Sequence, residues 1–179
     1  MKSAEFYIKH LDMEPHIEGG YFKECLLSGD TISYRGMKDR RLWSSIYFLL
    51  REGEVSHLHI IDSDEVWYFH DGNPLTIYMI SPVGMLSAPK LGLDAAGGEQ
   101  PQILVPKGYI FGAAMENEGY SLVGCMCAPA FRYETFELPT GEEIVAKYPA
   151  TARRESLIPL CLVIIITEIF CEKLKKRFG

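Results

Sequence analysis

The sequence lacks the short motifs that mark several large enzyme classes. It contains no GxGxxG fingerprint, no Walker A loop and no GxSxG elbow. It therefore gives no sign of a Rossmann dinucleotide site, a P-loop nucleotide site or a serine hydrolase. Internal repeats and low-complexity linkers are also absent, and a chain of 179 residues without such divisions favours one domain with a sizeable core.

Cysteine pairs and basic charge are scarce as well. The five cysteines are an odd number and form no CxxC pair, which is typical of reduced thiols in a cytosol. Cys125 and Cys127 share one face of an expected strand, but two thiols without a partner pair favour buried free cysteines. A net charge of -6 argues against binding nucleic acid, which needs a basic patch. We therefore expect a cytoplasmic protein that binds no nucleic-acid polymer.

No uninterrupted apolar run is long enough to suggest a membrane span. Residues 1–15 contain no apolar signal core, so secretion is not expected. The segment 157–170 is strongly apolar, but it is shorter than the ~18 residues of a spanning helix, and Pro159 and Glu168 interrupt it. We interpret it as an element docked on the body or on a partner subunit, or as an altered tail. The predicted organisation is one domain over 1–150 and an atypical apolar tail over 151–179.

Short strand-like segments dominate the domain. Each is rich in Val, Ile, Tyr, Phe or Thr, and turn residues separate them. Short helices are expected over 3–11, capped by Ser3, and over 141–148, capped by Thr140 and Glu143. Many short strands at this spacing predict an all-β sandwich or small barrel. The predicted strands are 44–50, 55–60, 65–70, 75–80, 102–105, 109–114, 120–127 and 131–138.

The segment SHLHIIDSDEVWYFHDG, residues 56–72, carries the strongest chemical signal. Strand side chains alternate between two faces, so His57 and His59 should project from the same face. By the same rule, Glu65 shares a face with Trp67 and Phe69. Two imidazoles and one carboxylate can form the facial triad of non-haem iron enzymes, so these residues could hold a metal ion. Metal-free pockets also contain paired histidines that hydrogen-bond a ligand, and both interpretations remain open.

This segment and several others resemble the cupins. Gly53, His57-x-His59, Glu65 and Gly72 are similar to the first cupin motif, and residues 106–111 line up with the second. The chain resembles most the small single-domain cupin-5 family of unassigned biochemical function. The resemblance implies a jelly-roll barrel (a double-stranded β-helix) with a pocket inside it, the fold of some sugar-nucleotide epimerases, and a homodimeric assembly. The blocks that carry it are 16–24, 45–50, 56–75, 101–108 and 119–138.

Two departures from the cupin pattern concern the metal. The typical last ligand is a histidine, whereas this chain has Phe111, whose phenyl carbons cannot donate to a metal. The spacing from His59 to Glu65 is one residue longer than usual. Asp64 stands at the usual spacing and is the alternative carboxylate if a bulge interrupts the strands. The sequence leaves open either one divalent metal ion (Fe, Mn, Ni or Zn) or none.

Aromatic residues are the expected walls of the pocket. Every second residue of the strands next to the histidines should share their layer in a barrel. Apolar walls with a few polar groups are typical of small-molecule sites, and aromatic walls suit a sugar, a base or an aromatic acid. The expected ligand-binding residues are Tyr21, Glu24, Tyr47, Trp67, Phe69 and Phe111.

Three function classes follow. The preferred one is a cupin that binds a ringed small-molecule metabolite inside the barrel. The first alternative is a metal-dependent oxygenase or isomerase, in which His57, His59 and Glu65 hold the metal. The second, by analogy of fold alone, is a metal-free epimerase with His57 or His59 as the base and Tyr47 or Tyr21 as the proton donor. We also expect a homodimer, with the segment up to Leu27 crossing to the partner.

Overall fold

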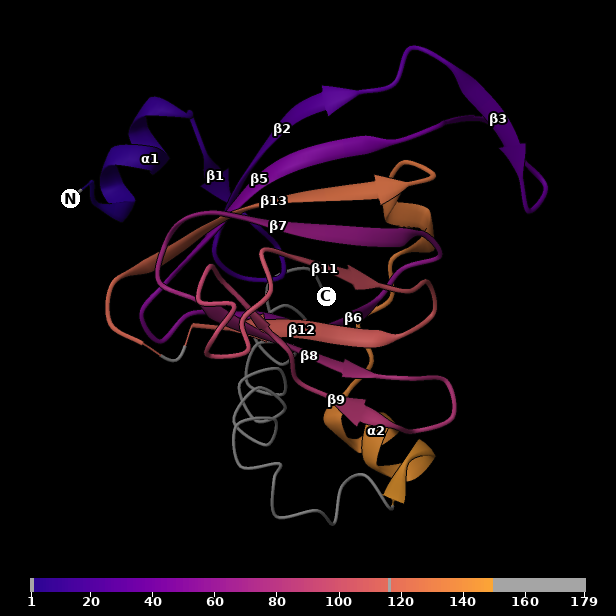
Figure 1. Cartoon of the computed structure of the whole chain (residues 1–179). Helices are drawn as coiled ribbons and strands as arrows, with labels where there is room; N and C mark the ends of the chain where they lie inside the picture. Colours follow the sequence, from indigo (N-terminus) through magenta and orange to yellow (C-terminus); the bar gives the residue numbers. More distant parts are fainter. Residues whose placement is uncertain (1, 116, 150–179) are drawn as a thin grey trace, which may run out of the picture.

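The computed structural model describes residues 2–115 and 117–149, and the apolar segment 157–170 lies outside them. No helix in these two stretches is long and apolar enough to cross a membrane. Figure 1 shows the elements in chain order: α1 (Ala4–His10), β1 (Glu14–Pro15), β2 (Tyr21–Leu27), β3 (Thr31–Tyr34), β4 (Met37–Arg41), β5 (Ser44–Arg51), β6 (Val55–Ile60), β7 (Asp64–Gly72), β8 (Leu75–Ile80), β9 (Leu86–Ser87), β10 (Lys90–Leu91), β11 (Gln102–Val105), β12 (Ile110–Ala114), β13 (Tyr120–Ala128), the 3-10 helix η1 (Tyr133–Thr135) and α2 (Gly141–Lys147).

Two antiparallel sheets face each other (Figure 1). The larger has the strand order β1-β2-β5-β13-β7-β11, and the smaller has the order β10-β8-β12-β6 with β9 paired to β8. Strands that are neighbours in a sheet are mostly distant in sequence, as in β5 with β13 and β6 with β12. This is the crossed connectivity of a jelly roll. The predicted all-β jelly roll with one short helix at each end of the domain is confirmed.

One predicted strand is wrong. Strand β13 ends at Ala128, and the segment 131–138 contains η1 and a single bridge from Glu137 to Ile60. Pro129 follows the strand and has no N–H for the ladder, and the Phe131 amide donates to Ser44 Oγ instead of to a neighbouring strand. The chain therefore leaves the sheet here, although its aromatic composition looks strand-like.

A hairpin of β3 and β4 extends from the larger sheet and pairs with no other described strand (Figure 1). This hairpin was not predicted, and four of the five residues of β4 are charged. Arg40 is its one fully buried side chain, and the guanidinium donates to both carboxylate oxygens of Asp62, at 2.6 and 2.7 Å. It also donates to the Ala130 carbonyl at 2.9 Å. This paired cation ties the hairpin to the turn between β6 and β7.

The two α-helices cover the outer faces of the sheets. Ser3 caps α1 by accepting the Phe6 amide, and Ala4 packs with Leu49 and Leu122 of the larger sheet. Thr140 and Glu143 form the predicted capping box of α2. Ile144 of α2 packs on the outer face of the smaller sheet, among Leu58, Tyr78 and Ile110. The space between the sheets is left to the main core.

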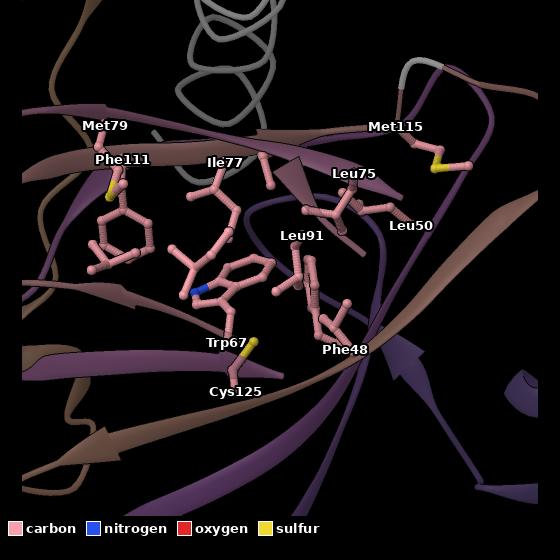
Figure 2. Packing of buried hydrophobic residues seen from close by; sticks show 14 of the residues in the cluster. Phe48, Leu50, Trp67, Leu75, Ile77, Met79, Leu91, Phe111, Met115 and Cys125 are labelled. Atoms are coloured by element: carbon pink, nitrogen blue, oxygen red, sulfur yellow. The ribbon is translucent and has the colours of Figure 1, made fainter. Parts of the chain in front are cut away.

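The main core lies between the facing sheets (Figure 2). Phe48 and Trp67 come from the larger sheet, and Ile77 and Phe111 come from the smaller one. All four are at most 2% exposed. This packing fills one end of the barrel, and it leaves room for a pocket beside Trp67.

A β-bulge on β6 changes which side chains point inward. Phe111 lies opposite His59 and Ala113 lies opposite Ser56, so two residues of β6, 57 and 58, oppose the single residue Gly112. A Cβ atom on Gly112 would lie 2.5 Å from the Ser56 carbonyl oxygen, so this close approach requires glycine. The strict alternation expected along residues 55–60 is therefore interrupted.

The loop between β1 and β2 closes against β6. Gly19 has a φ of +104°, and a Cβ on it would lie 2.2 Å from the Val55 carbonyl oxygen. The His57 amide donates to the Glu18 carbonyl at 2.8 Å and fixes the loop on the strand. This arrangement turns the Glu18 side chain into the barrel.

Candidate functional site

A pocket opens into the barrel between the larger sheet and the loop before β2. Its enclosed volume is about 120 Å³, and the figure is about 800 Å³ when the open solvent at the mouth is counted. Glu18, His59 and Glu65 form the buried floor, and their exposed fractions are 7%, 2% and 7%. The walls are aromatic and aliphatic, with two thiols. The wall residues are Phe22, Leu27, Ile46, Phe48, Ile61, Trp67, Cys125, Cys127, Phe131 and Tyr133.

The His59 ring is held in one tautomer. Its Nδ1 lies 2.7 Å from the His57 carbonyl oxygen, which can only accept, so Nδ1 carries the proton. Burial lowers the pKa of His59, so the neutral ring is favoured and its Nε2 has a lone pair. This Nε2 lies 3.5 Å from Glu18 Oε1. This contact is attractive when either Glu18 or His59 carries a proton between the two atoms.

Glu18 is held from two further sides. Its Oε2 accepts the Ser56 hydroxyl at 3.0 Å and lies 3.8 Å from His16 Nδ1. The Glu18 amide donates to the same Nδ1 at 3.2 Å, which places the proton of a neutral His16 on Nε2. Burial raises the pKa of Glu18 and lowers that of His16. Burial therefore favours the uncharged forms of both Glu18 and His16.

Glu65 is the second carboxyl of the floor. Burial raises its pKa from 4.5 to about 7, and the charge of Glu18 adds to this, while His59 opposes it. The Trp67 indole N–H is close enough to favour the ionised carboxylate, yet it makes no hydrogen bond of ordinary geometry. Glu65 therefore exchanges a proton near neutral pH, which suits a group that both donates and accepts.

The two thiols of the wall are protonated and unpaired with each other. Cys125 and Cys127 are free and buried, as predicted, and burial raises the pKa of both well above the ordinary value. Cys125 is paired across the strands with Trp67 (Figure 2). Such thiols act as small apolar wall groups rather than as nucleophiles.

Phe111 supports His59 from behind. The two ring centroids are 4.0 Å apart, and Phe111 is fully buried. The position that resembles the last cupin ligand therefore contributes packing here. The Phe111 ring packs against the imidazole of His59, which lines the pocket floor with the two carboxyls.

The structure brings only part of the predicted set together. His59, Glu65 and Trp67 line the pocket, and Glu24 lies at its exposed mouth. Phe111 adjoins it through His59.

Two predicted metal-binding candidates lie elsewhere. His57 is 4% exposed but does not line the pocket, because the bulge places it outside the alternation that His59 follows. Asp64 is exposed and accepts the Lys107 amide at 2.9 Å. Glu65 is thus the inward carboxylate, as alternation indicated.

Three predicted aromatic wall residues also face other surroundings. Tyr21 stacks with the Arg51 guanidinium at 4.9 Å, and both Tyr21 and Tyr47 pack in the outer cluster with α1. Phe69 packs on the main core without lining the pocket. The strands that carry these residues are correct, but the face assigned to Tyr47 was not.

Sequence reasoning missed Glu18 and His16. Neither shows a spacing signal, and both lie on the loop between β1 and β2. The available signal was the pair Gly19–Gly20, since consecutive glycines at positive φ allow a backbone to approach a strand closely. Phe131 and Tyr133 were missed because the segment that carries them was assigned to a strand.

The side chains do not fit a metal centre. Within residues 2–115 and 117–149, no three His, Cys, Asp or Glu side chains are arranged to hold a metal ion. Of the cupin ligand positions, His59 and Glu65 reach the pocket, His57 does not, and Phe111 has no donor atom. A cation there would have two of the expected ligands, and the added carboxyl of Glu18 is occupied by Ser56 and His59.

Comparisons with known proteins agree with this fold. The family described as Cupin superfamily (DUF985) matches residues 5–139. A crystal structure of a protein from Shewanella oneidensis is 52% identical, with a TM-score of 0.78, and the match covers 86% of this chain and 95% of that chain. A hypothetical protein from Leishmania major is 34% identical, with a TM-score of 0.80 and coverages of 85% and 96%.

More distant structures share the fold alone. A mutant of oxalate decarboxylase from Bacillus subtilis is 18% identical, with a TM-score of 0.51, over 77% of this chain and 35% of that chain. No curated protein matches the chain. The jelly roll and its internal pocket thus define a cupin. The chain belongs to the DUF985 family of the Cupin superfamily, whose biochemical function is unassigned.

Proposed function

We propose that this protein binds a small ringed metabolite inside the barrel. The observation that supports this is a pocket with aromatic walls and a buried acid–base floor. The enclosed volume of about 120 Å³ is below that of pockets for drug-sized ligands, so the pocket favours a single small ring that reaches in from the open mouth. Aromatic walls bind rings by stacking and edge contacts, whereas polar groups in the floor fix the orientation of the ring.

The floor offers hydrogen bonds of both kinds to such a ligand. Burial raises the pKa of both Glu18 and Glu65, and with a pKa of about 7 Glu65 donates or accepts near neutral pH. Trp67 offers an indole N–H that makes no hydrogen bond within the described chain. A sugar, a base or another ring with polar substituents can satisfy these groups.

Two adjacent residues of β5 provide a test by blocking the pocket. Ile46 lines the pocket, whereas Tyr47 packs on the opposite face of the sheet. We expect Ile46→Trp to abolish the binding of ring compounds, because the larger side chain fills the pocket. Tyr47→Trp is the matched control and should bind as the wild type does. Saturation-transfer NMR with a mixture of sugars, nucleosides and aromatic amines and acids measures the binding; equal binding by both variants would place the ligand elsewhere.

A second candidate function is proton transfer without a metal. The specific observation is that His59 Nε2, Glu18 and Glu65 converge on one pocket with shifted pKa values. A neutral imidazole can remove a proton from a bound substrate, and a protonated carboxyl can return one. Tyr21 and Tyr47 lie on the outer face, so Glu65 replaces them as the proton donor in this scheme.

Solvent deuterium tests this second candidate. A compound bound in the pocket should incorporate deuterium from D₂O at an acidic carbon, and Glu65→Gln should slow the incorporation by at least about 100-fold. Incorporation that is equal in Glu65→Gln and the wild type rules out Glu65 as the acid. A bound compound that exchanges no carbon-bound hydrogen leaves binding as the function.

A further inference from the structure

We infer that the ligand of this pocket is a ring that carries a basic amine, and that the pocket rejects carboxylates and phosphates. This inference rests on the proposed ring-binding function and names its ligand class. Two independent features carry it: the sign of the charge around the pocket and the chemistry of its walls.

The charged residues that line the pocket are all acidic. Glu18 and Glu65 lie on the floor and Glu24 lies at the mouth, whereas no described lysine or arginine lines it. His16 and His59 also line it, but burial favours their neutral forms. A buried anion would therefore meet no cation to offset its lost hydration, and it would meet like charge whenever Glu18 or Glu65 is ionised.

The nearest buried cation is already neutralised. Arg40 acts on the Cys127 thiol through space, but its guanidinium is bound by both oxygens of Asp62 and by the Ala130 carbonyl. A bidentate pair of this kind leaves little positive potential for a ligand. Arg40 also does not line the pocket.

The walls independently favour a cation. The faces of aromatic rings attract positive charge, and five aromatic side chains surround the cavity: Phe22, Phe48, Trp67, Phe131 and Tyr133. An ammonium group that enters this pocket loses water, and it regains favourable contacts from the rings and from a carboxylate. A carboxylate or phosphate would regain neither.

The Trp67 indole N–H is a donor that a polar ligand group in the pocket can use. Trp67 is 2% exposed and lines the pocket, and its Nε1 has no hydrogen-bond partner in the described chain. Figure 2 shows this nitrogen on the side of the indole that faces Phe111, the residue whose ring packs against His59. An amine-bearing ring with one hydroxyl or carbonyl acceptor would satisfy both the Trp67 donor and the carboxyl acceptors.

Three probes with one ring and three charges test the inference. Benzylamine is a cation at neutral pH, benzyl alcohol is neutral and benzoate is an anion. The chain has two tryptophans, so a ¹⁵N-labelled sample gives two indole N–H signals, which Trp43→Phe assigns. We expect benzylamine to shift the Trp67 signal at a concentration about tenfold below that of benzyl alcohol. Benzoate should leave it unchanged, and none of the probes should move the Trp43 signal.

Variants locate the origin of the selectivity. Glu65→Gln and Glu18→Gln should each remove most of the advantage of benzylamine over benzyl alcohol, because they delete one carboxylate and keep the shape. Glu52→Gln deletes an exposed carboxylate on a turn and should keep the wild-type ratio.

The outcomes separate this inference from the function on which it rests. If benzoate shifts the Trp67 signal as strongly as benzylamine does, charge selection is wrong and ring binding stands. If none of the three probes shifts it, ring binding in this pocket is wrong as well. An equal loss of selectivity in Glu52→Gln and Glu65→Gln would also overturn the inference, because the effect would then be one of net charge.

Discussion

Glu65 shows at the scale of one residue how burial prepares a carboxyl for chemistry. It is 7% exposed, and its pKa is raised to about 7 by burial first and by the charge of Glu18 second. His59, Trp67 and Cys127 act in the opposite direction. The group is therefore neither a fixed charge nor a permanently neutral acid at physiological pH.

This shift makes stability depend on pH in a definite direction. Between pH 4.5 and about 7 the folded protein keeps a proton on Glu65 that the unfolded chain releases. Raising the pH through this window therefore destabilises the folded state, and the penalty is complete above the folded pKa. Glu65→Gln removes the titration, so the variant should gain stability relative to the wild type as the pH rises from 4.5 to 8. A shift of this size corresponds to a gain on the order of 3 kcal/mol.

Urea denaturation at several pH values measures this difference. Only the difference between the two proteins is informative, because the lowered pKa values of His57 and His59 change stability in the opposite direction in both. Glu52→Gln, an exposed change of the same kind, serves as the control. A stability difference between Glu65→Gln and the wild type that is independent of pH would contradict the raised pKa.

At the scale of the element, the bulge on β6 selects one histidine of a pair. Ser56 and His59 turn toward Glu18, whereas Leu58 packs in the outer cluster under α2. The strand therefore supplies one imidazole to the floor and one hydroxyl that holds Glu18, instead of two imidazoles. The bulge is possible because Gly112 brings its backbone against Ser56.

Gly112→Ala tests this role of the bulge. The added Cβ would meet the Ser56 carbonyl oxygen at 2.5 Å, and backbone cannot move aside as a flexible side chain can. We expect a loss of unfolding free energy of about 1–3 kcal/mol. The control is Gly29→Ala, where a Cβ meets no atom within 4 Å, and its effect should stay within about 0.5 kcal/mol. Equal stabilities of the two variants in thermal or chemical denaturation would contradict the tight fit at Gly112.

The same elements show what the sequence could predict. Local pattern identified most strands, both capped helices and the inward face of Glu65, because alternation and capping act within a few residues. The bulge was not visible, since it depends on the register between β6 and β12, which are about fifty residues apart. Glu18 was missed for a related reason, because its position in the floor depends on a loop pressed against a distant strand. The faces of Tyr21 and Tyr47 depend likewise on where α1 packs.

At the scale of the whole molecule, one edge of the larger sheet is open. Strand β1 pairs with β2 only through Tyr21 and Phe22, so no described strand covers the outer edge of residues 23–27. Leu26 and Leu27 there are 59% and 48% exposed. Unpaired edges with apolar side chains favour pairing with another chain. We propose that the expected homodimer forms through this edge.

Sedimentation analysis tests this assembly. The wild type should sediment as a dimer at micromolar concentration, and Leu26→Lys should shift it to a monomer, since the charge faces the proposed interface. Leu104→Lys is the matched control because Leu104 is 52% exposed on β11, at the opposite edge of the same sheet. If only Leu104→Lys dissociates the dimer, the interface lies at that opposite edge. If the wild type is a monomer, the proposed dimer is wrong.

The loop that carries Glu18 has one consequence for how the floor can be observed. The backbone carbonyl of Glu18 accepts a hydrogen bond from the His57 amide at 2.8 Å. This bond must break whenever the loop moves away from β6. The rate at which that single amide hydrogen exchanges with solvent therefore counts the openings of the loop. A ligand that contacts the Glu18 carboxyl stabilises the closed loop and slows this exchange. The exchange rate of the His57 amide therefore reports how much of the pocket is occupied, even for a compound that has no spectral change of its own.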